Sequence, residues 1–138
     1  MRNSDVMRVQ EARIESQLGR LRNLIDRYSG TSDALPLTVQ LNRFIGVWRG
    51  VIVARDRLVY RPRAISTERC EVLMARTCGE RMNKVAERVE AYGQRWSSSA
   101  VIASDFALFR RQSAALMAAI EAHFNCDRSL LNRGPIAA

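Results

Sequence analysis

Apolar residues recur at alternating spacings of four and three residues through four long stretches of this 138-residue chain. The first stretch carries them at Met7, Ile14, Leu18, Leu21 and Ile25. Because this spacing lines up side chains along one stripe of an α-helix, it is typical of helices that pack into a bundle. No stretch alternates apolar and polar residues as a strand would, so the sequence predicts an all-α fold.

Residues that start and stop helices give the expected boundaries. Ser4 is a good N-cap for the first helix, and Ser104 or Asp105 is a good N-cap for the last. Pro62 disfavours helical geometry in the residue before it, and Gly134-Pro135 is a strong stop signal. We expect helices over about 4–28, 37–60, 67–96 and 105–133. Four helices with short connections predict a single domain, residues 1–138, folded as an up-down-up-down four-helix bundle.

Polar residues interrupt the apolar stripes at positions that this topology brings to one end of the bundle. Glu11 breaks the first stripe and Arg55 breaks the second. On the last stripe, counting by threes and fours from Ile120 reaches His123, the only histidine, and then Asp127. A charged group on a buried stripe is costly unless it is paired or bound to a metal. We therefore expect one polar layer in the core, in which Arg55 bridges Asp127 and Glu11.

Two segments of the chain resemble motifs of the hemerythrin-like, or HHE cation-binding, bundles of bacteria. The run GVWRGVIVARDRLVY at 46–60 is similar to the family's helix ending H-x-x-x-E-D-x-x-L-Y-P, and HFNCDR at 123–128 is similar to its last-helix motif H-x-x-x-E-E. Members of the family hold two irons with His and carboxylate ligands from all four helices, and they bind dioxygen or sense redox state. The resemblance implies this bundle over nearly the whole chain.

Compared with the family's ligand pattern, this chain keeps few metal ligands. The histidine position of the first helix corresponds to Glu11, and the histidine and glutamate positions of the second helix correspond to Val51 and Arg55. His123 is retained, while Asp127 stands where the family has glutamate. A single histidine cannot build an ordinary di-iron centre, so we expect a bundle without a cofactor.

A reduced iron site is the alternative interpretation of the same residues. Glu11, His123 and Asp127 would offer two carboxylates and one nitrogen, a set suited to iron or manganese. The protein would then be a metal-dependent sensor of oxygen, nitric oxide or redox state. A fixed guanidinium at Arg55 puts positive charge where the cation would sit, which favours the metal-free ion network.

The chain is strongly basic, with 22 Lys and Arg residues against 14 Asp and Glu residues. Four arginines around the end of the second helix could bind a nucleotide, a nucleic acid or an acidic protein: Arg49, Arg57, Arg61 and Arg63. Since the arginines are spread along the chain and no nucleic-acid-binding motif is visible, we favour a solvated basic face. An anion-binding module remains an alternative function.

More apolar residues lie beside the expected seams than a four-helix monomer needs. On the second helix they include Ile45, Ile52 and Val59, and on the last helix Met117. We therefore expect either a homodimer or a protein partner that covers these side chains.

The function predicted from the sequence is a regulatory or interaction protein on a metal-free, ligand-degenerate hemerythrin-like bundle. No catalytic triad, paired-carboxylate acid–base site or phosphate loop is visible, so we expect no enzyme activity. The start of the chain has no apolar leader and no run is long enough to span a membrane, which favours a cytoplasmic protein with reduced thiols. Cys126 beside the polar layer would suit a redox sensor, although simple packing is the more common role of a helical cysteine.

Overall fold

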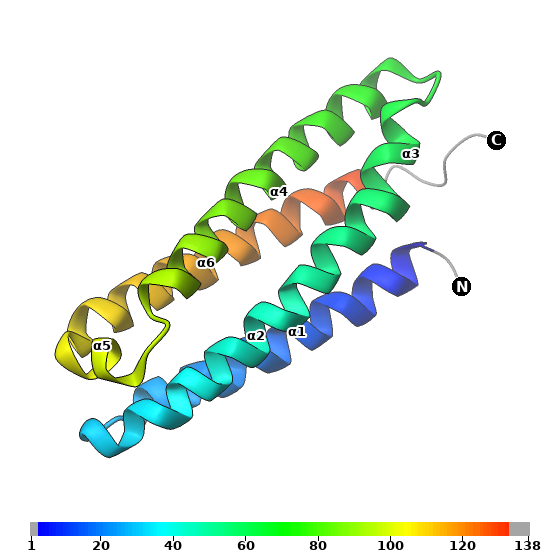
Figure 1. Ribbon diagram of the computed structural model, residues 1–138. Coiled ribbons are helices and arrows are strands. Elements are labelled where there is room, and N and C mark those ends of the chain that lie inside the picture. Colours follow the sequence, from blue (N-terminus) through cyan, green and yellow to red (C-terminus); the bar gives the residue numbers. More distant parts are fainter. Residues whose placement is uncertain (1–2, 133–138) are drawn as a thin grey trace.

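The computed structural model describes residues 3–132. These residues form an all-α structure, as predicted, and contain no strand. Four long helices lie lengthwise beside one another (Figure 1): α1 Asn3–Asp26, α2 Ala34–Arg55, α4 Arg69–Arg95 and α6 Phe106–Leu131. Shorter segments join them: η1 Thr31–Asp33, η2 Asp56–Tyr60, α3 Arg61–Ala64 and α5 Ser99–Ser104. The stop expected at Gly134-Pro135 lies outside the described residues.

The long helices pack most extensively in two pairs, α1 with α2 and α4 with α6. α2 also packs against α4, whereas α1 and α6 approach each other much less closely. The start of α1, the end of α6 and α3 lie at one end of the molecule (Figure 1). Within residues 3–132, no helix combines the length and the apolar character needed to cross a membrane.

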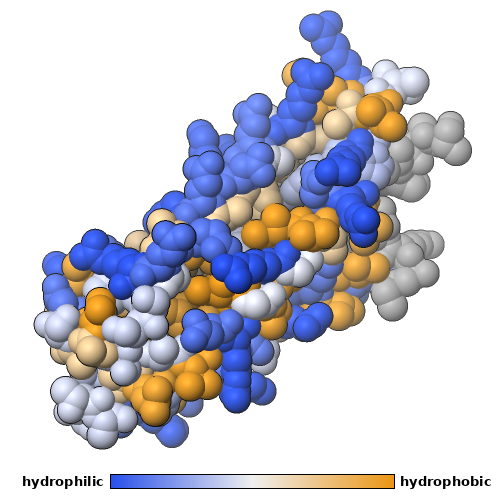
Figure 2. All heavy atoms as spheres, in the orientation of Figure 1, coloured by the Kyte–Doolittle hydropathy of each residue, from blue (hydrophilic) through white to orange (hydrophobic). Residues whose placement is uncertain are grey.

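The predicted apolar stripes form the core between these helices. The largest fully buried side chains include Trp48 and Phe44 of α2, Trp96 after α4 and Phe109 of α6. Figure 2 shows hydrophilic side chains over much of one face, with hydrophobic residues in patches between them. The start of α6 is capped as expected, since the Asp105 carboxylate accepts a hydrogen bond from the backbone N–H of Leu108 at 3.2 Å.

The second predicted helix does not end before Pro62, so that expectation was wrong. The chain continues from α2 through one π-helical turn, η2, into the extra α-helical turn of α3. Arg61, the residue before the proline, keeps helical angles (φ −59°, ψ −50°). A helical proline lacks an N–H and its ring crowds the carbonyl four residues earlier, which here is that of Leu58. Leu58 lies within the π turn η2, which widens the helix just before the proline.

The π turn also changes which side chains face the core. Hydrogen bonds in a π-helix join residues five apart, so Tyr60 returns to the inward face of Arg55. Tyr60 and Val59 are buried, whereas Leu58, expected on the inward stripe, is 39% exposed. The π turn therefore places the side chain of Tyr60 in the polar layer of the core.

Candidate functional site

Arg55 lies in the core with no exposed surface. Its guanidinium pairs with Asp127 of α6 and with Glu11 of α1, where Nη2 and Oε1 are 3.3 Å apart. The Cζ atom of Arg55 lies 4.5 Å from the ring centroid of Phe124. A buried guanidinium between two carboxylates neutralises charges that would otherwise be costly in the core. The structure thus brings together the charged residues that interrupt the three apolar stripes.

Tyr60 and His123 complete a buried cluster that we call the Arg55 network, consisting of Glu11, Arg55, Tyr60, His123 and Asp127. The Tyr60 hydroxyl lies 2.8 and 2.7 Å from Oδ1 and Oδ2 of Asp127, and 2.9 Å from Nε2 of His123. His123 Nε2 also lies 3.1 Å from Asp127 Oδ2. Burial, and then the negative charge of Asp127, raise the pKa of Tyr60, so the phenol stays protonated and donates to the carboxylate.

The two ring nitrogens of His123 have different surroundings. Nδ1 is buried and has no hydrogen-bond partner among residues 3–132, whereas Nε2 faces Tyr60 and Asp127. Because the Tyr60 hydroxyl already donates to Asp127, a proton on Nε2 lets His123 donate to either oxygen. The ring of His123 is therefore held on its Nε2 side, while Nδ1 stays without a partner among the described residues.

The Arg55 network reaches the surface through Glu11. Oε2 of Glu11 accepts hydrogen bonds from Nε and Nη2 of Arg128 at 3.0 and 2.7 Å. The Arg128 side chain is 48% exposed and its Nη2 also lies 3.7 Å from Glu15. Glu11 is therefore shared between a fully buried arginine and a half-exposed one, and the two carboxylates of the network are balanced by two guanidiniums.

The three residues considered as alternative metal ligands do not form a ligand group. The Arg55 guanidinium contacts both Glu11 and Asp127, so the two carboxylates are directed at an arginine. Within the described part of the chain, no three His, Cys, Asp or Glu side chains are placed to hold a metal ion. Val51, at the position of the family's second-helix histidine, is a buried apolar residue. This donor set fits a guanidinium better than a metal cation.

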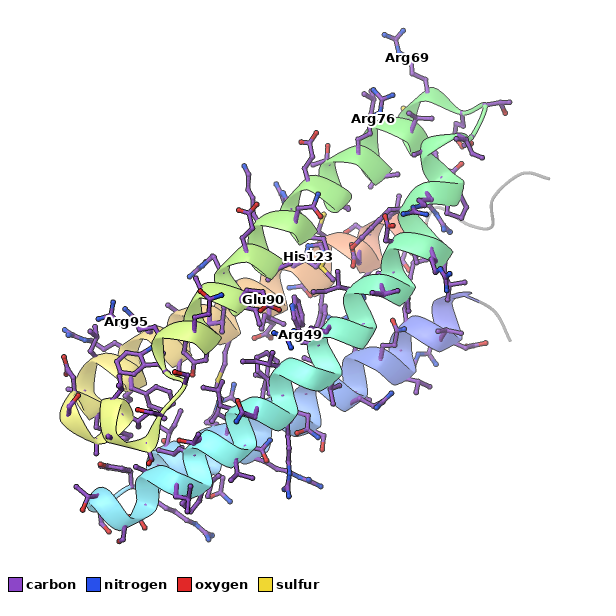
Figure 3. The ribbon with its side chains drawn as sticks, viewed as in Figure 1. Arg49, Arg69, Arg76, Glu90, Arg95 and His123 are labelled. Atoms are coloured by element: carbon purple, nitrogen blue, oxygen red, sulfur yellow. The ribbon has the colours of Figure 1, made fainter. Side chains whose placement is uncertain are left out.

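The four arginines of the alternative anion site have different surroundings: Arg49, Arg57, Arg61 and Arg63. Arg49 makes a bidentate pair with Glu90 of α4, with both N–O distances 2.8 Å. Figure 3 shows these two side chains between α2 and α4. Arg61 lies 2.7 Å from Asp56, one turn earlier in the chain. Carboxylates therefore already neutralise two of the exposed guanidiniums.

Arg63 is buried and belongs to a second ion pair. Its Nε lies 3.6 Å from Oε1 of Glu71, and the other carboxylate oxygen of Glu71 accepts a hydrogen bond from Ser66 at 2.9 Å. Burial lowers the pKa of Arg63, and the charge of Glu71 opposes this shift. This pair joins α3 to the start of α4 and has a structural role, because its arginine is only 3% exposed.

The residues expected at an interface lie mostly in the core. Ile45, Val59 and Met117 are at most 7% exposed, and Ile52 is partly buried. The expectation treated each stripe as one residue wide, whereas a bundle helix buries a broader face. These side chains are therefore covered by the chain itself and do not form an exposed apolar patch.

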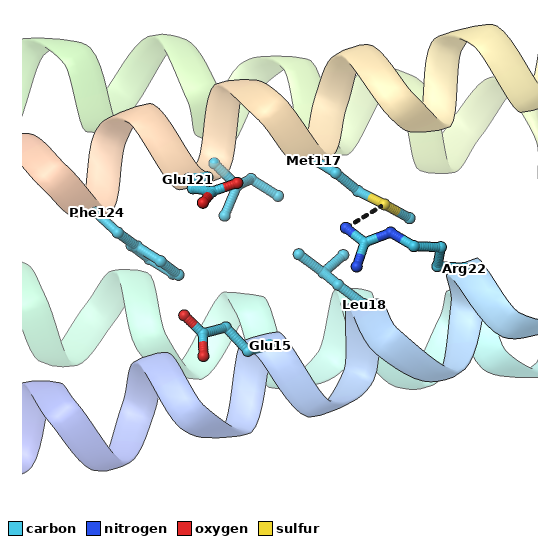
Figure 4. Close-up of a pocket in the computed structure, with 7 residues that line it drawn as sticks. Glu15, Leu18, Arg22, Met117, Glu121 and Phe124 are labelled. Atoms are coloured by element: carbon cyan, nitrogen blue, oxygen red, sulfur yellow. Dashed lines mark hydrogen bonds between the residues drawn. The ribbon is translucent and has the colours of Figure 1, made fainter.

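The surface is hollowed along the seam between α1 and α6 (Figure 4). A hollow of about 260 Å³ has apolar side chains on its floor and charged ones at its rim: Leu18, Met117, Ile120, Phe124, Glu15, Arg22 and Glu121. A second hollow lies beside Arg8 and Arg128, and a third beside Arg110 and Ala118. Because α1 and α6 line all three, we call them together the α1–α6 groove.

The Arg55 network and the α1–α6 groove are thus the two features of the described residues that carry a functional argument. Polar residues on the apolar stripes of the sequence predicted most of the network. The groove could not be predicted in this way, because it depends on how closely two helices pack. The resemblance to hemerythrin-like bundles rests on the two sequence motifs. Comparison of the chain with protein-family models, with curated proteins and with solved structures finds no match.

Proposed function

We propose that this protein is a non-catalytic regulatory or interaction protein, built on a hemerythrin-like up-down-up-down bundle in which an arginine replaces the metal centre. The observation that carries the metal-free part is the Arg55 guanidinium, which pairs with both Glu11 and Asp127. It supplies positive charge where the family's cation would sit. We place this protein in the cytoplasm.

The binding surface in this proposal is the α1–α6 groove, and its occupant is an amphipathic helix of a partner protein. Leu18, Ile120 and Phe124 lie beneath the groove and are buried by the chain's own packing, while Glu15 and Arg22 provide charges of both signs on α1 (Figure 4). Helix-in-groove recognition uses apolar anchors at helical spacing, flanked by polar contacts at the rim. In this proposal the partner helix lies along the seam between α1 and α6, flanked by the charges of Glu15 and Arg22.

Ala118 gives a direct test because it is exposed and lines the groove. Ala118→Arg would extend a long charged side chain across the groove without changing the core. Ala91→Arg, at an exposed position of α4, is the matched control. Each full-length variant is used to capture proteins from its source cells, and each captured protein is then purified and titrated against the variants.

The proposal predicts a partner that binds the wild-type chain and Ala91→Arg alike and loses at least about tenfold in affinity for Ala118→Arg. A partner that binds both variants equally would place the binding surface elsewhere. Light scattering gives a further check on the occupant. A dimer that only Ala118→Arg disrupts would show that a second copy of the chain fills the groove.

A further inference from the structure

Two cysteines from different helices meet beside the Arg55 network. Cys78 lies on α4 and Cys126 on α6, and their Sγ atoms are 2.7 Å apart. The Cys78 thiol also faces the backbone carbonyl of Cys126, with 3.6 Å between Sγ and O. Both are free thiols, and they lie on two helices that pack extensively against each other. The fold therefore holds the two sulfur atoms in contact.

The two thiols differ in their access to solvent. Cys78 is 1% exposed, whereas Cys126 is partly exposed. Burial raises the pKa of Cys78, followed by its hydrogen bond with Cys126. A reagent in solution can therefore reach Cys126 first, and Cys78 is placed behind it to complete the reaction. The third cysteine, Cys70, is exposed and lies two turns before Cys78 on α4, so it provides an internal comparison.

We propose that Cys78 and Cys126 form a redox modification site, which a low-molecular-weight disulfide oxidises to an intramolecular disulfide between α4 and α6. The Cys126 thiolate attacks one sulfur of the reagent, whose S–S bond breaks, and a first thiolate leaves and takes up a proton. The Cys78 thiolate then attacks Cys126 Sγ and displaces the second thiolate, which is also protonated. Two cysteine thiols lose two electrons and two protons, and the reagent disulfide becomes two thiols.

The contact between the two sulfur atoms carries this inference, and it does not depend on the α1–α6 groove or on a partner protein. Disulfide exchange of this kind requires one accessible thiol and a second thiol within bonding reach, and both conditions are met here. In a compartment with a glutathione buffer the pair would report the thiol–disulfide balance. The nearby Asp127 links the modified helix α6 to the Arg55 network.

The test uses a full-length chain with Cys70→Ser, so that Cys78 and Cys126 are the remaining thiols. Folded protein is equilibrated in buffers of reduced and oxidised glutathione, precipitated with acid, dissolved in denaturant at neutral pH, alkylated with a maleimide, and weighed intact. We expect two maleimide labels in the reducing buffer and none in the oxidising one. The oxidised chain should be lighter than the reduced, unlabelled chain by about 2 Da, the mass of two hydrogens.

Cys78→Ser in the same background is the control, and it should give a stable glutathione adduct on Cys126. The proposal is overturned if the Cys70→Ser chain itself stops at such an adduct with Cys78 still labelled. Full labelling of both thiols in the oxidising buffer, or disulfide-linked dimers in place of the lighter monomer, would equally overturn it.

Discussion

Replacing Arg55 by methionine tests the central claim about the core, because it removes the charge and keeps much of the side-chain length. Arg55 has no exposed surface, and its two partners Glu11 and Asp127 are buried. Removing one member of a buried ion pair costs about 3–5 kcal/mol, since a charge remains without its partner. Tyr60 would still donate to Asp127 and Arg128 to Glu11. We therefore expect a loss near the lower end of the range, about 3 kcal/mol.

The measurement is urea unfolding followed by far-ultraviolet circular dichroism, applied to a double-mutant cycle. The cycle consists of wild type, Arg55→Met, Asp127→Asn and the double variant. Because the double variant removes both charges of the pair, its loss should fall short of the sum of the single losses by about 1–3 kcal/mol. Arg49→Met is the matched control, since Arg49 pairs with Glu90 at the surface and should matter much less.

The pH dependence supplies an independent check on the same variant. In Arg55→Met, a carboxylate stranded in the core gains from taking up a proton, so the folded variant binds more protons than its unfolded chain. The free energy of unfolding then rises as the pH falls. The deficit of Arg55→Met relative to wild type should shrink between about pH 7 and about pH 4. A deficit below about 1 kcal/mol at neutral pH, similar to that of Arg49→Met, would refute the claim that Arg55 neutralises Glu11 and Asp127.

Three further predictions follow from individual contacts. Burial raises the pKa of Tyr60, so its contribution to stability is complete below the unfolded phenol's pKa of about 10 and is lost above it at about 1.4 kcal/mol per pH unit. In urea unfolding above this pH, Tyr60→Phe should reduce the slope of unfolding free energy against pH by that amount. An unchanged slope would contradict the burial of Tyr60. Gly50→Ala, whose new Cβ meets nothing within 4 Å, should stabilise α2 by about 0.5–1 kcal/mol. Gly93→Ala should stabilise less, because its new Cβ would lie 2.4 Å from Ile45 Cδ1 and this end of the side chain must shift. Equal gains in the free energy of unfolding would show that Ile45 does not limit position 93. Protein purified without chelator should contain far less than one iron or manganese per chain by plasma mass spectrometry, and a stoichiometric metal lost in His123→Ala would instead support the metal-dependent sensor.

The sequence was sufficient to place most of the Arg55 network. Glu11, Arg55, His123 and Asp127 lie in regular α-helices, so counting by threes and fours assigns them to the inward faces. Counting fails after Arg55, because the π turn changes the rotation per residue. Tyr60 was therefore missed as a member of the network. The signal that could have revealed it is Pro62, since a wider turn before a proline is one way for a helix to accommodate the ring.

The surroundings of surface and interface residues could not be predicted in the same way. They depend on how two helices pack together, and the spacing of residues along a single helix does not contain that information. Met117 and Ile45 are covered by neighbouring helices that the sequence does not place. Arg49 pairs with Glu90, which is 41 residues away in the sequence. No local sequence pattern could therefore predict that the charge of Arg49 is neutralised. The contact between Cys78 and Cys126 across 48 positions is likewise a product of how α4 packs on α6.

A buried ion network is seldom the most stable way to fill a core, so the value of the Arg55 network lies in the geometry that it imposes. One guanidinium must meet Glu11 and Asp127 at once, and this fixes α1, α2 and α6 relative to one another along their axes. Farther along the α1–α6 seam, the contact is made by Arg22, an exposed side chain that donates to Met117 Sδ at 3.5 Å.

A helix entering the hollow beside Arg22 could displace this arginine at little cost, because exposed polar contacts contribute little to stability. Ala118, which lines that hollow, is exposed and lies outside the Arg55 network. We therefore expect Ala118→Arg to weaken binding while its unfolding free energy stays within about 0.5 kcal/mol of wild type. Arg55→Met should do the reverse at temperatures where it remains folded. If Ala118→Arg destabilised the chain as much as Arg55→Met, the groove would be part of the core and would not be available to a partner.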